Sequence, residues 1–146
     1  MLVLLWEPLN GRWQLQRVGA VDFRCQNSSN PEPDRPECGT PEALLQPLRG
    51  WTGQREILRP QPGAQASVEY ASPVTLDPHQ LLHNDCSAVM PDGLVFSVPS
   101  VLPEAAFSLE IGGRLAAELF QQISIHFDAL GHLTRWERCC FRPAAA

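Results

Sequence analysis

Apolar and polar residues alternate along much of the chain after residue 50, with the two-residue period of a β-strand. In residues 107–111 three apolar side chains face one way and two polar side chains face the other. Turns containing Pro or Gly separate the candidate strands, and no long amphipathic helix lies between them. The pattern predicts strands at 51–59, 65–76, 80–89, 93–98, 106–112, 115–127 and 133–142. It therefore indicates an all-β protein with an antiparallel sandwich or barrel, although residues 115–119 also have local helical propensity.

A β-hairpin is predicted near the start of the chain, where Asn10-Gly11 is typical of a two-residue type I′ turn. In that register Trp6 lies opposite Leu15, and Pro8 lies opposite Trp13. One face of the ribbon is then apolar, formed by Leu4, Trp6, Pro8, Trp13 and Leu15. Because two strands alone are marginally stable in water, we expect this face to pack on another part of the protein.

A second hairpin with the same plan is predicted at 125–137, with a turn at Asp128-Ala129-Leu130-Gly131 and its glycine in the left-handed conformation. Both hairpins place an aromatic residue, an acid and a glycine turn before an amphipathic return strand. Two interpretations stay open: duplicated lobes, or the general likeness of hairpins.

The chain is divided by a Pro-rich polar segment at 26–40, which is predicted to be a linker. Thr40-Pro41 is typical of a helix start, and Pro47 ends a short helix at 41–46. We therefore expect an N-terminal hairpin at 1–25 and a β domain at 41–143. Residues 1–25 are either the remnant of a first lobe, packing outside the barrel, or the first strands of the barrel itself, and the linker favours the first interpretation.

Composition and charge exclude several classes of function. The formal net charge is −5, and all eleven basic residues are arginines, so there is no lysine for a Schiff base or a P-loop. An acidic protein is not expected to bind nucleic acid, because its net charge repels the phosphate backbone. No segment is long enough for a membrane span, the apolar start lacks the pattern of an export signal, and we expect a soluble protein with reduced cysteines.

No catalytic signature occurs in the sequence, so an enzyme is not expected. His79, His83 and Cys86 have metal-ligand spacing, but no fourth ligand is evident, and a zinc enzyme is the weakest hypothesis. Strand alternation places the side chains of Cys139 and Cys140 on opposite faces. The same alternation predicts that His126 and Glu110 face solvent.

The candidate ligand-binding side chains are aromatic residues and arginines. Aromatic rings line a cavity for a flat ligand or simply fill the core, and an arginine either holds a ligand carboxylate or lies on a solvated face. Arg55 has the same strand parity as Trp51, so a buried Arg55 would need a partner. The aromatic candidates are Trp51, Trp136, Phe96, Phe107 and Phe127, and the arginines are Arg55, Arg114 and Arg135. The predicted site consists of Trp51, Arg55, Phe96, Phe107, Phe127 and Arg135.

The segments "LRGWTGQREILRP" (48–60), "MPDGLVFSVPSVLPEAAFSLEIGG" (90–113) and "ISIHFDALGHL" (123–133) resemble a family of uncharacterised two-lobed, calycin-like proteins of cyanobacteria and algae. That family is distantly related to the phycobiliprotein lyases. The resemblance covers about residues 44–142. It departs from the family at Arg49, where a glycine is usual, and at His126-Phe127, where the family has arginine and tyrosine.

The resemblance implies an all-β, antiparallel lipocalin-like barrel with one short helix before its first strand and an extra N-terminal hairpin. It implies non-catalytic binding of a small, largely apolar ligand, with a bilin or other tetrapyrrole as the candidate and no required cofactor. A phycobiliprotein or a partner lobe is the candidate protein partner, and the cytoplasm, or the plastid stroma of an alga, is the expected location. The alternatives are a solid-core interaction module without ligand and lyase-like chromophore transfer.

Overall fold

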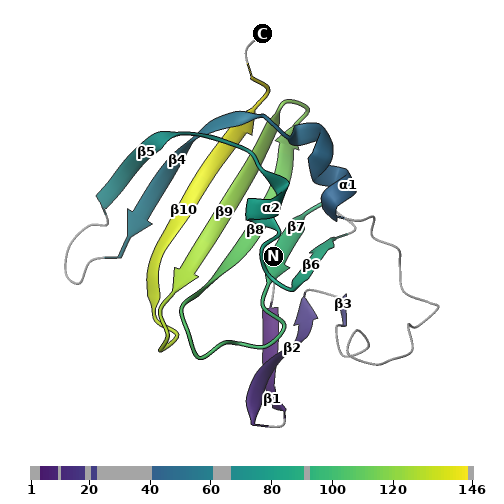
Figure 1. The fold of residues 1–146 in the computed structure, drawn as a ribbon, viewed down its shortest axis with the longest axis vertical. Helices are drawn as coiled ribbons and strands as arrows, with labels where there is room; N and C mark the ends of the chain where they lie inside the picture. The colour runs from purple at the N-terminus through teal and green to yellow at the C-terminus, as the bar shows by residue number, and fades with distance from the viewer. Residues whose placement is uncertain are drawn as a thin grey trace.

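The computed structural model describes residues 4–9, 11–18, 21–22, 41–60, 67–90 and 93–144. Seven strands form one antiparallel sheet in the order β5-β4-β10-β9-β8-β7-β6, and β1, β2 and β3 form a separate small sheet (Figure 1). The strands of the main sheet are β4 (Thr52–Arg59), β5 (Ser67–Thr75), β6 (Cys86–Val89), β7 (Val95–Val98), β8 (Phe107–Ala116), β9 (Leu119–Phe127) and β10 (Leu133–Arg142).

The all-β prediction is confirmed, and helix is confined to short segments: α1 (Pro41–Leu45), η2 (Gln46–Leu48) and α2 (Pro78–Leu81). The first strand of the sheet, β4, pairs with the last, β10. The edges of the sheet are β5 and β6, and no ladder among the described residues joins these two strands. Within the same part of the chain, no helix is long and apolar enough to cross a membrane.

The predicted strand at 80–89 is wrong over its first half. Residues 78–81 form α2, and the strand begins only at Cys86. The Asp77 side chain accepts a hydrogen bond from the backbone N–H of His79 (3.0 Å), and Pro78 fills the first helical position. These two start signals outweigh the strand propensity of the residues that follow.

The predicted break between the strands at 106–112 and 115–127 is also wrong. β8 continues through Gly112 and Gly113 to Ala116, and the turn lies at residues 117–118, so residues 115–119 do not form a helical turn. Gly112 is explained by packing, since a Cβ there would lie 2.6 Å from Cζ of Phe120. The glycine therefore makes room for the ring rather than for a turn.

One face of the sheet, called the inner face below, is covered by α2 and closed at one end by α1 and η2. Leu81 of α2 and Leu45 and Leu48 of the other helices are buried against this end. They belong to an apolar cluster that also contains Leu76, Val89, Val95, Phe120, Cys139 and Phe141. Figure 1 shows α2 in front of β7 and β8, in the position from which it covers this face.

The opposite face, called the outer face, is covered in part by the small N-terminal sheet, which consists of β1 (Leu4–Leu9), β2 (Arg12–Val18) and β3 (Val21–Asp22). Leu15 is 1% exposed and packs with Phe96, Val98 and Leu109. The register of β1 on β2 pairs Trp6 with Leu15 and Pro8 with Trp13, as predicted. Gly11 adopts a left-handed conformation (φ 79°), while Asn10 lies outside the described residues.

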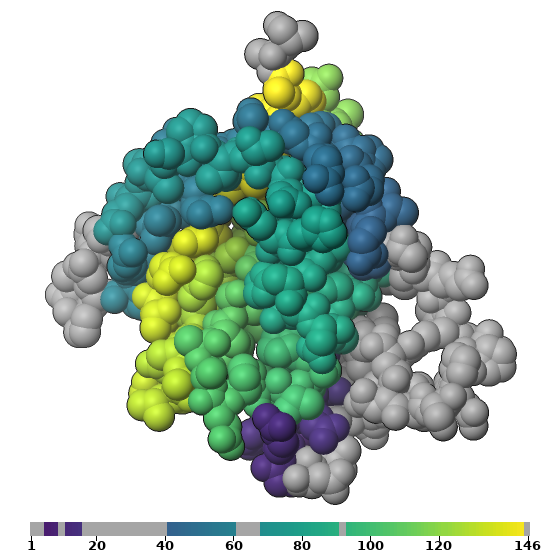
Figure 2. All heavy atoms as spheres, in the orientation of Figure 1, coloured from purple at the N-terminus to yellow at the C-terminus, as the bar shows by residue number. Residues whose placement is uncertain are grey.

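The hairpin of β1 and β2 joins the rest of the protein through the segment that follows β7. The backbone N–H of Leu15 donates to the carbonyl of Ser100 (2.6 Å), and that of Leu102 donates to Trp13 (2.8 Å). The Trp6 indole N–H donates to the carbonyl of Pro99 (3.2 Å). In Figure 2 the hairpin lies against the lower end of the main sheet. The hairpin thus packs on the main sheet from outside. The predicted linker at 26–40 is not among the described residues. The interpretation of residues 1–25 as the remnant of a first lobe therefore stays a prediction.

Candidate functional site

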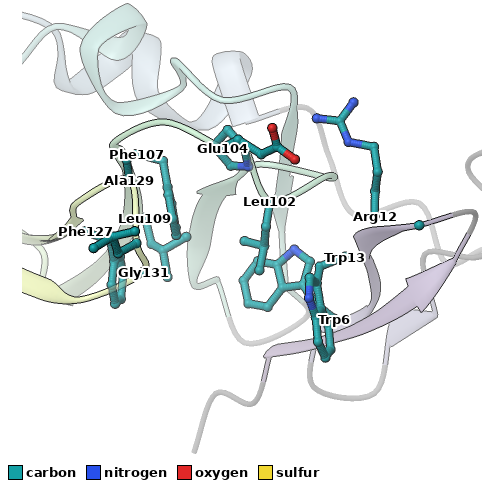
Figure 3. Close-up of a pocket in the computed structure, with 13 residues that line it drawn as sticks. Trp6, Arg12, Trp13, Leu102, Glu104, Phe107, Leu109, Phe127, Ala129 and Gly131 are labelled. Carbon is teal, nitrogen blue, oxygen red and sulfur yellow. The ribbon is translucent and has the colours of Figure 1, made fainter.

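An aromatic cavity of about 460 Å³ lies between the N-terminal hairpin and the outer face of the sheet (Figure 3). The hairpin contributes Trp6 and Trp13, and the sheet contributes Phe107 and Phe127. Figure 3 shows the two indoles on one side and the two phenyl rings on the other. The remaining lining residues are Gly11, Arg12, Leu102, Pro103, Glu104, Leu109, Ala129, Leu130 and Gly131. Its volume is within the range of small-molecule sites.

The phenyl wall of the aromatic cavity is set by strand register. Phe107 begins β8 and lies directly opposite Phe127 at the end of β9. Their rings stack with centroids 5.0 Å apart and planes 17° apart. Beyond them, Asp128-Ala129-Leu130-Gly131 turns the chain, with Gly131 at φ 84° as predicted. The Asp128 carboxylate accepts hydrogen bonds from the backbone N–H groups of Leu130 and His132, each 2.9 Å long.

A second cavity of about 590 Å³, called the rim cavity below, lies at the same end of the sheet. Phe107, Phe127 and Pro103 line both cavities, so the stacked phenyl pair is a shared wall. The other lining residues are mainly polar: His83, Asn84, Pro99, Ala106, Ser108, His126, Asp128, Thr134 and Arg135. The two cavities therefore differ in chemistry.

Beside the rim cavity, three basic side chains surround the carboxylate of Glu137 on the inner face. Arg135 donates from Nε to Oε1 (3.2 Å), and Arg55 places its Nε 3.7 Å from Oε2. His126 Nε2 lies 3.5 Å from Oε2, is buried, and makes no hydrogen bond within the described structure. Arg55 thus has the acidic partner that its predicted inward position required. The prediction that His126 faces solvent is wrong, because its side chain is 21% exposed and lies on the inner face.

Deeper on the inner face, Glu110 is 4% exposed and accepts hydrogen bonds from several polar side chains. Gln122 donates to Oε2 (3.0 Å), as does Ser124, and Ser108 reaches Oε1 (3.3 Å). The imidazole of His83 lies 3.0 Å from Oε1. The prediction that Glu110 faces solvent is therefore wrong: the polar side of β8 faces α2 and the segment after it. A buried carboxylate is tolerated there because its lone pairs have donors.

The neighbouring Ser108, His83 and Glu110 resemble the composition of a catalytic triad but not its geometry. Ser108 Oγ and Glu110 Oε1 both lie 3.0 Å from the same nitrogen of His83, Nε2. A general base must bind the nucleophile on one ring nitrogen and its orienting acid on the other. This cluster is suited to holding the His83 segment against the sheet. Asn84 serves the same purpose, since its amide donates to the carbonyls of Ser97 (2.9 Å) and Ser108 (2.8 Å).

The six residues of the predicted site are divided between the two faces. Phe107 and Phe127 line both cavities, and Arg135 lines the rim cavity. Phe96 is completely buried in the outer apolar cluster. Trp51 packs at the opposite end of the sheet on the inner cluster, and Arg114 lies over its ring at 5.6 Å. Among the other aromatic candidates, Trp136 is 40% exposed and lines a small cavity between β4, β5 and β10.

The candidate zinc ligands do not converge. His79 is exposed, His83 reaches Glu110, and Cys86 is buried in the outer cluster. Within the described residues, no group of three or more His, Cys, Asp and Glu side chains is placed to hold a metal ion. Cys139 and Cys140 point to opposite faces as predicted, and burial raises the pKa of the Cys139 thiol to about 11.

Sequence reasoning did not include Trp6 and Trp13 in the site, although it predicted their shared apolar face. The signal was the excess of aromatic area on a ribbon too small to bury it. Trp13 stays 54% exposed even in the folded protein. The sequence pattern could not predict that the hairpin lies beside Phe107 and Phe127, because its position depends on contacts with the segment at 99–102.

In comparisons with known proteins, no family model, curated protein or solved structure matches the chain.

Proposed function

We propose that this protein is a non-catalytic binding protein for a small, largely apolar ligand, which it holds in the aromatic cavity. The observation that carries the proposal is a cavity of about 460 Å³ walled by two indoles and a stacked phenyl pair. Aromatic walls of this kind contribute most of the free energy of binding for a flat apolar ligand. The lining comes from two separate sheets, so the ligand would contact both and hold the hairpin in place.

The finer fold assignment is part of the same proposal. We propose that the main sheet is a calycin-like barrel that is open between β5 and β6. The pairing of β4 with β10 and the consecutive β7-β8-β9-β10 order support it. In this protein the inner face is filled by α2, the His83 segment and the polar side chains around Glu110. The ligand site is therefore proposed on the outer face.

The test is saturable binding of the neutral probe N-phenyl-1-naphthylamine, measured by its fluorescence. Trp13→Ala is the informative variant, and Trp136→Ala is the matched control. Both tryptophans are about half exposed (54% and 40%), so neither substitution removes a buried core residue. We expect Trp13→Ala to weaken binding about tenfold, or ~1.4 kcal/mol, and Trp136→Ala to change it less than about twofold. Equal effects, or no saturable binding to the native protein, would reject the proposed site.

A tetrapyrrole is the specific ligand that the family resemblance suggests. Biliverdin is the direct probe: a saturable red shift of its absorbance that Trp13→Ala reduces would support a bilin ligand, and an unchanged spectrum would remove it. Chromophore transfer needs a further observation, a covalent adduct on an acceptor protein.

The second candidate function is a solid interaction module without a ligand. The specific observation in its favour is the filled inner face, where Glu110 and Ser124 are buried in a hydrogen-bonded layer. The two candidates differ in the probe experiment, since a solid module binds N-phenyl-1-naphthylamine without saturation or not at all.

A further inference from the structure

The rim cavity has an apolar wall and a basic wall that face the same space of about 590 Å³. Phe107, Phe127 and Pro103 form the first wall, while Arg135 and His126 belong to the second. We propose that this cavity is a second binding site, separate from the aromatic cavity, for a small carboxylic acid with an apolar body.

The basic wall has donors that its hydrogen bond to Glu137 does not use. Arg135 and Arg55 share one carboxylate, that of Glu137, and each approaches it through Nε. Within the described residues, the hydrogen bond that Arg135 makes uses Nε and not its terminal guanidinium nitrogens, and its side chain is 38% exposed. A guanidinium held at Nε presents its remaining N–H groups in a fixed direction, which suits a second carboxylate. The terminal N–H groups of Arg135 are therefore the donors that an acidic ligand would use.

The other carboxylates near the rim cavity already have their own donors. Glu110 is buried and accepts from Ser108, Gln122 and Ser124, with His83 at 3.0 Å. Asp128 accepts two backbone N–H groups from its own turn. The hydrogen bond from the His132 backbone, together with that from Leu130 and the nearby His132 ring, lowers the pKa of Asp128. The lone pairs of these carboxylates therefore have donors within the protein, whereas the terminal N–H groups of Arg135 are not used by the hydrogen bond to Glu137.

His126 gives the basic wall a second donor. Its ring lines the cavity, and its Nε2 lies 3.5 Å from Glu137 Oε2 without a hydrogen bond. Thr134 fixes the same strand end by donating to the backbone carbonyl of His126 (3.2 Å). An acidic ligand would bind the terminal N–H groups of Arg135 while Nε stays on Glu137, beside Arg55 and His126. The apolar body of the ligand would then lie against the phenyl pair.

This inference does not depend on the proposed function of the aromatic cavity, although both sites use the phenyl pair as a wall. The experiment compares 1-naphthylacetate with 1-naphthylacetamide, which have the same apolar body and differ in charge. Calorimetric titration of the native 146-residue chain gives both affinities. We expect the acid to bind about tenfold more tightly than the amide.

Arg135→Gln is the informative variant, and Arg138→Gln is its matched control. Arg138 is on the same strand but the opposite face, where it pairs with Glu56 at 2.5 Å. Arg135→Gln should reduce the preference for the acid to less than about twofold, and Arg138→Gln should leave it near tenfold. The preference for the acid over the amide is measured on the native protein, so the test remains valid even if one variant does not fold.

A competition titration separates the two sites. N-phenyl-1-naphthylamine bound in the aromatic cavity should stay bound when 1-naphthylacetate saturates the rim cavity. Equal affinity for acid and amide, an acid preference that survives in Arg135→Gln, or competitive displacement of the naphthylamine would each overturn the second site. If the naphthylamine does not bind at all but the acid preference is found, the proposed function fails and this inference stands.

Discussion

The two faces of the main sheet are built from the same strands but held in opposite ways. On the outer face, Phe96, Val98 and Leu109 pack with Leu15 of the hairpin in an apolar layer. On the inner face, apolar packing is confined to the end near α1, and the middle is the layer of polar side chains around Glu110. The side chains of the first layer gain stability mainly from apolar burial, whereas those of the second depend on hydrogen bonds that offset the burial of their polar groups.

This difference also explains where the cavities are. The outer layer is covered by a separate hairpin whose shape does not follow the sheet to its end, so the aromatic cavity remains beside Trp13. The inner layer is fastened through directional hydrogen bonds from the His83 segment, and the rim cavity begins where that segment ends. Each cavity therefore lies where the segment that covers one face of the sheet ends.

The largest expected effect comes from removing the centre of the outer layer. Phe96 is completely buried, so Phe96→Ala should lower the free energy of unfolding by about 3–5 kcal/mol through lost burial and a new cavity. Urea unfolding monitored by circular dichroism measures it. Trp136→Ala, at a half-exposed position of the same face, should cost less than about 1 kcal/mol. A similar decrease in the free energy of unfolding for both variants would contradict the assignment of Phe96 to the centre of the outer layer.

Leu15→Ala tests whether the hairpin is part of that layer. Leu15 is 1% exposed, and its truncation should cost about 2–3 kcal/mol, with one unfolding transition for the whole protein. A loss below about 0.5 kcal/mol, or two separate transitions, would mean that the hairpin folds independently of the main sheet.

Ser124→Ala tests the inner layer. The substitution removes a donor from the buried Glu110 carboxylate and should destabilise the protein by about 1–2 kcal/mol, because a buried acceptor loses a partner. The control is Ser100→Ala, whose hydroxyl bonds the exposed Asp85 and should cost less than about 1 kcal/mol. A neutral or stabilising Ser124→Ala would show that the polar layer does not depend on this bond.

The adjacent Cys139 and Cys140 lie on opposite faces of the sheet, so their thiols report on the two faces at one position along β10. Burial raises the pKa of Cys139 to about 11, so its thiol holds its proton in the folded protein above the pH at which the unfolded thiol loses it, about 8.5. The contribution of Cys139 to stability is thus complete below about pH 8.5 and declines as the pH rises toward 11.

Alkylation by iodoacetamide at pH 8, located by peptide mass spectrometry, measures the same contrast in the native state. Cys140 should react at least about tenfold faster than Cys139, and the two should react alike in urea. Equal native rates would contradict the assignment of Cys139 to a closed inner layer.

Most of the strands could be predicted from the sequence because alternation is a local signal. The ranges 133–142 for β10 and 93–98 for β7 came close to the observed bounds. The errors lie where tertiary contacts decide. The local sequence around Gly112 predicts a turn. Only the position of the Phe120 ring, which leaves no room for a Cβ, explains why this glycine lies within a strand.

The candidate site could be predicted in part for the same reason. Alternation placed Phe107 and Phe127 on one face and Glu110 on the other, but it carries no information about which face is covered. The solvent position expected for Glu110 followed from the usual rule that the polar face is outside. Segment 76–85 overrides that rule by bringing donors to the polar side. The pairing of Trp13 with the phenyl wall depends likewise on a contact far along the chain.

Ligand binding in the aromatic cavity is tested through the indole N–H signals of the four tryptophans in a ¹H–¹⁵N spectrum of the native protein. Single Trp→Phe variants assign the signals. Because Trp6 and Trp13 line the aromatic cavity while Trp51 and Trp136 lie elsewhere, N-phenyl-1-naphthylamine should shift the first two signals saturably and leave the other two unchanged. Shifts at Trp51 or Trp136 without shifts at Trp6 and Trp13, or no shift at saturation, would contradict the account.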